Sequence, residues 1–355
     1  MIKMKKLIWF NANVPKDSLM VAAIIKRLQR KGYNFLVTTR EHESTSHLLE
    51  YLGVKPIVVG KYGGRTLKEK LIASLKRGLD LINILDDYPA PSWTIHFACP
   101  EVARVAYGLG YKNIVIEDTA HASIVHRLTL PLADFFITPK CNPKSLFVHM
   151  INPEKILQYN GVDPVEWITA FPPKSEVIKE LNLDPSRPIV VLRPAETFAY
   201  YYLHITKGRS LLFEDRIIKY MLENTPEVQI VVLPRYEEQR NTLIKNFKDK
   251  IVIPKKFILA FNLIAFSTLL ITGGGTMVQE GALLGIPSLY YFPKRIAYAD
   301  YLEKKGFPVI HAPTYKEIKD WVSRILKDPD EYRVDTASML KKLEKPSDKL
   351  LEIIE

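Results

Sequence analysis

The strongest constraint on the fold of this chain is its regular alternation of short apolar runs with longer amphipathic segments. Runs such as "KLIWF", "NIVI" and "IVVL" have the length of buried strands, and segments with helical periodicity, such as residues 67–85, follow most of them. Strands that are each followed by a helix form a parallel sheet with helices on both faces. The sequence therefore predicts an α/β protein made of doubly wound, Rossmann-like sheets.

A proline-rich region interrupts this alternation over residues 139–188, and the alternation then resumes. Clustered prolines favour a boundary between domains, and 355 residues are enough for two domains of ordinary size. We predict an N-terminal domain over residues 1–165, a C-terminal domain over 166–330 and a charged, helical final segment over 331–355. Asp17 or Ser18 is expected to cap the first helix.

Ligands of open parallel sheets bind beyond the carboxyl ends of the strands, and the cleft between two such domains is the expected site. In the N-terminal domain, this rule selects catalytic candidates and residues on the side of an acceptor. The catalytic candidates are Asp118, His121, Glu117 and His96, and the acceptor-side candidates are Asn13, Arg40 and also Lys16, which opens the first helix. In the C-terminal domain, the rule selects Arg193, Arg235 and a run of glycines.

That run lies in "LITGGGTMVQEGALLGIPSL", residues 270–289. Gly273–Gly275 permit a tight turn, and Thr276 opens a helix whose free amides and dipole favour a phosphate. No Lys-Ser/Thr pair follows the glycines and no acidic residue ends the next strand, so neither a Walker A loop nor a dinucleotide fingerprint fits. Glu280 is placed to accept hydrogen bonds from a ribose; a carboxylate near a helix N-terminus also complements the helix dipole without any ligand.

The net charge of +11 suits an anionic partner such as a nucleotide or an acidic membrane surface, and equally a lysine-rich surface that only keeps a protein in solution. Lys and Arg are scattered, which argues against nucleic acid. The two cysteines, Cys99 and Cys141, form no metal-ligand or disulfide pattern, and no apolar stretch reaches transmembrane length. We expect a cytoplasmic protein and leave open peripheral contact with the inner face of a membrane.

The stretch "TGGGTMVQEGALLGIPS" resembles the donor-binding segment of GT-B glycosyltransferases and of the related UDP-N-acetylglucosamine 2-epimerases. In that superfamily a Gly-rich loop holds the nucleotide diphosphate and a Glu holds the ribose, and Gly273, Gly274, Gly275 and Glu280 match those positions. Together with "LQYNGVDPVEWITAF" and "IVIEDTAHASIVHRLTLP", it makes nearly the whole chain similar to DUF354, an archaeal and bacterial family of unknown function in this superfamily. The resemblance implies two Rossmann-like domains facing across a cleft, with the C-terminal helix packed back on the first domain.

The candidate chemical groups each have a purely structural alternative. Asp118, with His121 beside it, is the favoured general base, although Asp118 and Thr119 can also cap a helix. Glu117 occupies the place nearest to a Glu that takes part in proton transfer in the resembling epimerases. His96 contacts a sugar or an acceptor, or is a buried histidine with a backbone partner. Arg193 and Arg235 bind phosphate oxygens, or pair with Glu196 and Glu237.

These residues fit three functions. The first is a metal-independent glycosyltransferase with a nucleotide-sugar donor, most readily a UDP-sugar, and a saccharide or lipid-linked acceptor; it needs no cofactor. The second is a nucleotide-sugar 2-epimerase or hydrolase, and the third is a non-catalytic nucleotide-binding protein. The spacing of Asp118, His121 and His126 matches no standard set of metal ligands. The nucleobase, the sugar, the acceptor and the oligomeric state stay open.

Overall fold

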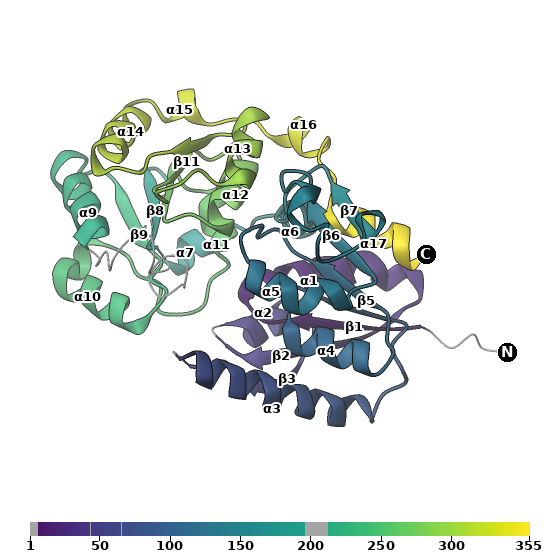
Figure 1. The fold of residues 1–355 in the computed structure, drawn as a ribbon. Helices are drawn as coiled ribbons and strands as arrows, with labels where there is room; N and C mark the ends of the chain where they lie inside the picture. The colour runs from purple at the N-terminus through teal and green to yellow at the C-terminus, as the bar shows by residue number, and fades with distance from the viewer. Residues whose placement is uncertain (1–5, 43, 65, 196–211) are drawn as a thin grey trace. The chain divides into compact units, whose positions relative to one another are not determined.

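The structure, a computed structural model, describes residues 6–42, 44–64, 66–195 and 212–355 (Figure 1). It divides into two compact units: unit 1 comprises Met1–Phe171 and Leu343–Glu355, and unit 2 comprises Pro172–Lys342. Each unit is built on one parallel sheet with helices on its faces. The prediction of two doubly wound α/β sheets is therefore confirmed.

Unit 1 contains a seven-stranded parallel sheet in the order β3-β2-β1-β4-β5-β6-β7. Its strands are β1 (Leu7–Ala12), β2 (Asn34–Glu41), β3 (Ile57–Lys61), β4 (Trp93–His96), β5 (Asn113–Ile116), β6 (Phe135–Pro139) and β7 (Ile156–Tyr159). Its helices are α1 (Pro15–Leu28), α2 (Thr45–Tyr51), α3 (Leu67–Leu85), α4 (Pro100–Gly108), α5 (Ser123–Thr129), α6 (Val165–Ala170) and α17 (Pro346–Ile354). The strand order reverses between β1 and β4, so the carboxyl ends of these strands mark the switch point where ligands of such sheets bind.

The last strand of unit 1 and the last helix of the chain lie together. Strand β7 forms inside the proline-rich region, where the sequence pattern indicated no strand, and pairs with β6. Helix α17 packs against β6 and β7. At its start, Ser347 donates hydrogen bonds to the Glu166 carboxylate from its backbone N and from its hydroxyl, at 2.9 and 2.8 Å. The chain therefore ends on the unit in which it began.

Unit 2 contains a five-stranded parallel sheet in the order β12-β11-β10-β8-β9. Its strands are β8 (Ile189–Arg193), β9 (Gln229–Val232), β10 (Leu269–Thr272), β11 (Ser288–Tyr290) and β12 (Val309–His311). Its helices are α7 (Glu176–Glu180), α9 (Leu212–Asn224), α10 (Glu237–Phe247), α11 (Ala260–Ala265), α12 (Thr276–Leu283), α13 (Ala297–Lys304), α14 (Tyr315–Lys327), α15 (Pro329–Tyr332) and α16 (Ala337–Leu340). The apolar run near residue 251 forms only a bridge, between Val231 and Val252.

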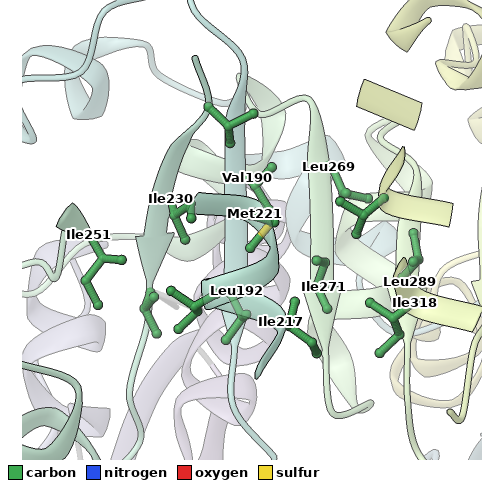
Figure 2. Close-up of a cluster of buried hydrophobic side chains, with 14 of the residues drawn as sticks. Val190, Leu192, Ile217, Met221, Ile230, Ile251, Leu269, Ile271, Leu289 and Ile318 are labelled. Atoms are coloured by element: carbon green, nitrogen blue, oxygen red, sulfur yellow. The ribbon is translucent and has the colours of Figure 1, made fainter. Parts of the chain in front are cut away.

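The unit 2 sheet is buried on both faces. Val190 and Leu192 of β8 point to one side, where Ile217 and Met221 of α9 cover them (Figure 2). Val191, between them in the sequence, belongs to the cluster on the other face, together with residues of α7 and α11. Burial of alternate residues on opposite faces explains why the strand reads as a continuous apolar run.

Helix α12 approaches this sheet so closely at Gly281 that a side chain has no room. A Cβ there would lie 2.2 Å from Ser288 Oγ and 2.8 Å from Leu270 Cδ2. We expect Gly281→Ala to lower the free energy of unfolding by about 1–3 kcal/mol, because α12 must shift away from β10 and β11. Gly78→Ala in α3, where no atom lies within 4 Å of an added Cβ, should raise it by roughly 0.5–1 kcal/mol. Urea unfolding distinguishes these outcomes; equal midpoints for both variants would contradict the expectation.

Candidate functional site

Buried carboxylates surround Lys16 at the carboxyl edge of the unit 1 sheet. Lys16 lies at the start of α1, and its Nζ is 2.5 Å from Asp118 Oδ1 and 2.7 Å from Asp163 Oδ2. Asp118 follows β5 and Asp163 follows β7, so residues far apart in the sequence meet at one edge of the sheet. The Lys16 side chain is 18% exposed, whereas those of Asp118 and Asp163 are only 6% and 1% exposed. Loss of either partner of such a buried pair leaves an uncompensated charge.

Neighbouring side chains orient the two carboxylates. The Tyr159 hydroxyl donates a hydrogen bond to Asp163 Oδ1. The Thr119 hydroxyl donates to Asp118 Oδ1 at 3.2 Å, and Asn142 Nδ2 donates to the Asp118 backbone carbonyl at 2.8 Å. Polar groups thus surround both carboxylates, and three residues of this arrangement, Asn142, Tyr159 and Asp163, were not selected from the sequence. Each of them lies on or just after β6 or β7.

Burial and neighbouring charges set the pKa values of Lys16 and Asp163. Burial alone lowers the pKa of Lys16, but Asp118, Asp163 and Glu117 outweigh it and hold that pKa well above its ordinary value. Burial, with Asp118 adding to it, raises the pKa of Asp163 to about 6, although Lys16 opposes the rise. Lys16 is therefore a cation at neutral pH, and Asp163 changes its protonation state near pH 6.

A further carboxylate, Asp17, lies in the first turn of α1. The sequence indicated that Asp17 or Ser18 caps this helix; neither is the N-cap residue, because the helix starts at Pro15 after Val14, but Asp17 takes part in capping as the third helical residue of a capping box. Proline is favoured at the first helical position because its fixed φ suits the helix. Asp17 Oδ2 accepts hydrogen bonds from the backbone N of Asn13 at 2.9 Å and of Val14 at 3.3 Å. Burial still raises the pKa of Asp17 to about 7.

The connection between β5 and α5 carries Glu117 and His121 beside Asp118. Glu117 Oε1 accepts a hydrogen bond from the Thr119 backbone N at 2.7 Å. His121 is exposed, and His126 is buried edge-on against Phe147. Burial lowers the pKa of His126. Within the described ranges, no three His, Cys, Asp or Glu side chains are grouped so as to hold a metal ion.

His96, at the end of β4, is buried and makes a backbone contact. Its Nδ1 accepts a hydrogen bond from the Cys99 backbone N at 3.0 Å. Burial lowers the pKa of His96 to about 4, against a smaller opposing effect of the Asn113 side chain. The neutral ring thus holds the turn that leads into α4. This arrangement is that of a buried histidine with a backbone partner, one of the two interpretations of His96 given above.

We expect His96 to make stability depend on pH. Its folded pKa is about 4 and its ordinary pKa is 6.5, so the contribution of the neutral ring is present above pH 6.5 and is lost as the pH falls towards 4. The stability advantage of the wild type over His96→Gln, which retains an acceptor, should shrink by about 2–3 kcal/mol across this window. Urea unfolding at several pH values measures it; a constant difference would contradict a buried neutral histidine.

Arg40 and Asn13 occupy two further places at this edge. Arg40 lies over the Tyr62 ring, 5.2 Å from its centroid, near the β2 end. Asn13 Oδ1 accepts a hydrogen bond from Asn11 Nδ2 at 3.1 Å, and Asn11 Oδ1 accepts one from Arg77 at 2.5 Å. The buried Arg77 also pairs with Glu101 at 2.7 Å. Asn13 therefore lies between two sets of side chains: Lys16 with its carboxylates, and Arg77 with its partners Asn11 and Glu101. The sequence did not indicate the second set.

In unit 2, the glycine run forms the turn between β10 and α12. Gly274 and Gly275 have φ of 113° and 88°, a region that favours glycine. A Cβ at Gly273 would lie 2.5 Å from the Ala195 Cα, so the loop also passes close to the chain after β8. Gly275 is the N-cap residue of α12, followed by Thr276. The turn thus leads directly into the N-terminus of a helix, with Glu280 buried in its second turn.

Arg193 and Arg235 contact backbone carbonyls at this same edge. Arg193 Nη1 donates hydrogen bonds to the carbonyls of Leu233 and Pro234, at 2.8 and 3.0 Å. Arg235 Nε donates to the Pro194 carbonyl at 3.3 Å. The two side chains thereby tie together the segments that follow β8 and β9. Glu196, the expected partner of Arg193, lies outside the described residues.

Solved structures with the same fold include nucleotide-sugar enzymes. UDP-GlcNAc 2-epimerase from Neisseria meningitidis, bound to UDP-GlcNAc, gives a TM-score of 0.73 at 12% identity, covering 98% of both chains. The UDP-GlcNAc 2-epimerase from Methanocaldococcus jannaschii gives 0.68 at 14% identity, covering 98% of this chain and 99% of that one. Spinosyn rhamnosyltransferase SpnG, complexed with spinosyn aglycone, gives 0.63 at 14% identity, covering 99% of this chain and 100% of that one. At these identities the likeness establishes the fold, which is the GT-B fold.

Sequence comparison gives the family. An uncharacterized protein of Methanocaldococcus jannaschii is 30% identical over 306 residues, which cover 84% of this chain and 85% of that protein. The sequence pattern of DUF354, described as a protein of unknown function, matches residues 7–354. The match extends over nearly all of both units and includes the Lys16 group and the glycine turn. The chain therefore belongs to the DUF354 family.

Proposed function

We propose that this protein is a nucleotide-sugar-dependent glycosyltransferase whose unit 2 binds the donor diphosphate. The observation that carries the proposal is the turn at Gly274 and Gly275, which reaches the N-terminus of α12 with positive φ at both residues. Such a turn presents free backbone amides, and the helix dipole adds a partial positive charge. The amides of Gly275 and Thr276 are therefore the proposed diphosphate ligands.

Glu280 and Arg235 complete the proposed donor site. A buried carboxylate in the second turn of α12 is a suitable acceptor for ribose hydroxyls, which lie next to the diphosphate in any nucleoside diphosphate. Arg235 adds positive charge at the same edge of the sheet, while Arg193 positions the loop through its carbonyl contacts. Because one enzyme of this fold has been solved with UDP-GlcNAc bound, a UDP-sugar is the proposed donor.

Unit 1 supplies the proposed base. Asp118 takes the proton of an acceptor hydroxyl while the acceptor oxygen forms a bond to the anomeric carbon and the bond from that carbon to the diphosphate breaks. The Lys16 ammonium holds the Asp118 carboxyl group in place at 2.5 Å, and the exposed His121 lies on the same connection. The negative charge that develops on the leaving diphosphate is stabilised by the α12 N-terminus and Arg235. The acceptor is a saccharide or a lipid-linked group.

A second candidate, a nucleotide-sugar 2-epimerase or hydrolase, is favoured by the number of carboxylates near Lys16. Proton transfer at two positions of one sugar requires an acid as well as a base. Asp118 lies 2.5 Å from the Lys16 ammonium, whereas Asp163, with a pKa of about 6, is present in both protonation states in slightly acidic solution. The carboxylates around Lys16 thus offer both a base and an acid.

Incubation of UDP-sugars with the protein, with and without acceptors, distinguishes the two reactions. Turnover only in the presence of a saccharide or lipid-linked acceptor supports transfer, whereas an epimer or a free sugar formed without any acceptor supports the second candidate. In either case Asp118→Asn should abolish turnover and leave UDP affinity in calorimetry unchanged. Retained cellular function in that variant would instead indicate a non-catalytic nucleotide-binding protein. Absence of affinity for every nucleoside diphosphate would overturn all three.

A further inference from the structure

Helix α3 presents a continuous apolar surface to solvent. It lies along the outer edge of unit 1 beside β3 (Figure 1) and packs against β3 and α4. Four leucines spaced four residues apart point away from those contacts: Leu67, Leu71, Leu75 and Leu79 are 79%, 61%, 64% and 65% exposed. Ile72 and Ile82 extend the same face and are 44% and 36% exposed. We call these six side chains the α3 apolar face.

Another side of the helix packs on unit 1 over its C-terminal half, from Arg77 to Leu85, whereas residues 67–76 contain no buried side chain. Leu81 and Leu85 are buried in the core of unit 1, and Arg77 is buried against β3. A helix with an apolar stripe on its inner side needs no second stripe for folding. Contiguous exposed apolar surface of this kind is rare on proteins without a partner and marks an interaction site.

Two lysines, Lys68 and Lys76, border the face, and one carboxylate, Asp86, continues it at the C-terminal end of the helix. The spacing of 3.6 residues per turn places Lys68 and Lys76 in a row with Ile72, directly beside the leucines. The acidic residues Glu69 and Asp80 lie on the side of the helix away from the leucines by the same spacing. Glu69 is also engaged at the helix start, where it accepts a hydrogen bond from the Thr66 backbone N at 2.9 Å. The partner therefore meets apolar side chains and positive charge together.

We propose that the α3 apolar face binds the surface of a bilayer that contains anionic lipids. The leucines enter the region between headgroups and acyl chains, while the stems of Lys68 and Lys76 extend to phosphate groups. The helix lies on the bilayer: none of the helices in the described parts of the chain is long and apolar enough to cross one.

Vesicle co-sedimentation tests this inference independently of any donor or reaction. The wild type should bind vesicles of mixed phosphatidylcholine and phosphatidylglycerol, and bind pure phosphatidylcholine much more weakly. Replacing Leu71, Leu75 and Leu79 together by Gln should lower the affinity on the order of a hundredfold. Lys68→Gln with Lys76→Gln should lower it about tenfold and weaken its dependence on salt. Gln is a good helix former, so α3 should remain folded in each variant.

The matched control removes exposed apolar side chains elsewhere. Ile244→Gln with Phe266→Gln changes residues of unit 2 that are 46% and 41% exposed, and should leave vesicle binding unchanged. Equal binding by the leucine variant and the wild type, or no binding of the wild type to anionic vesicles, would overturn the proposal. So would a dimeric wild type in sedimentation velocity that becomes monomeric in the leucine variant, because a second copy would then cover the face.

Discussion

Gly274→Asp should reduce the affinity for UDP by about a hundredfold or more. Gly274 has a φ of 113°, and it precedes the N-cap residue of α12, where the proposed diphosphate binds. An aspartate there adds a negative charge beside the phosphates and favours a different backbone conformation, so the amides of the turn no longer converge on the ligand. Isothermal titration of UDP into the variant measures the loss.

Gly306→Asp is the matched control for backbone strain. Gly306 also has a positive φ, of 86°, and lies in unit 2 just after α13; the nearest atom to an added Cβ is Met339 Cε at 3.7 Å. Both variants should be destabilised by about 1–2 kcal/mol, which urea unfolding measures. Only Gly274→Asp should lose UDP affinity. If both lose it equally, strain alone explains the effect and the glycine turn is not the phosphate site.

The bounds of helices with a clear apolar period or a capping box were predicted closely from the sequence. The boundaries of α3, residues 67–85, match its apolar period, and α14 begins at Tyr315 because Thr314 and Glu317 form a capping box. Strand β7 was missed because prolines surround it, and its place in the sheet comes from pairing with β6 and from cover by α17. Such long-range contacts leave no local pattern.

The site residues show the same limit. Asp118 was selected because it follows a strand and Lys16 because it opens the first helix, but their pairing spans 102 positions and depends on β1 and β5 ending at the same edge. Asp163 was missed together with the strand that precedes it. For Arg193, the residue type suggested a phosphate, whereas the observed hydrogen bonds go to carbonyls of the segment after β9. The type of a residue and its position at a strand end therefore locate a site, whereas its hydrogen-bonding and ionic partners can be identified only from the fold.

Lys16→Met should destabilise the protein by about 3–5 kcal/mol at neutral pH. The change leaves Asp118 and Asp163, whose side chains are 6% and 1% exposed, without the cation that neutralises them. Methionine has a similar length and preserves the packing of the apolar stem, so the effect reports the charge. Lys16→Arg, which retains a cation, should cost much less. Urea unfolding of the three proteins at several pH values measures both effects.

The pH dependence of Lys16→Met identifies the cause of its instability. The pKa of Asp163 is already about 6 with Lys16 present, and removal of the cation raises it further above the value of the unfolded chain. The folded variant then takes up protons as the pH falls, so its deficit relative to the wild type should be largest above neutral pH and should shrink towards pH 5 or so. Asp163→Asn in the Lys16→Met background should restore part of the stability at neutral pH, because it removes one uncompensated charge and retains the acceptor for Tyr159. A deficit that is independent of pH, and not reduced by Asp163→Asn, would mean that Lys16 acts through packing and that the carboxylates carry no charge to balance.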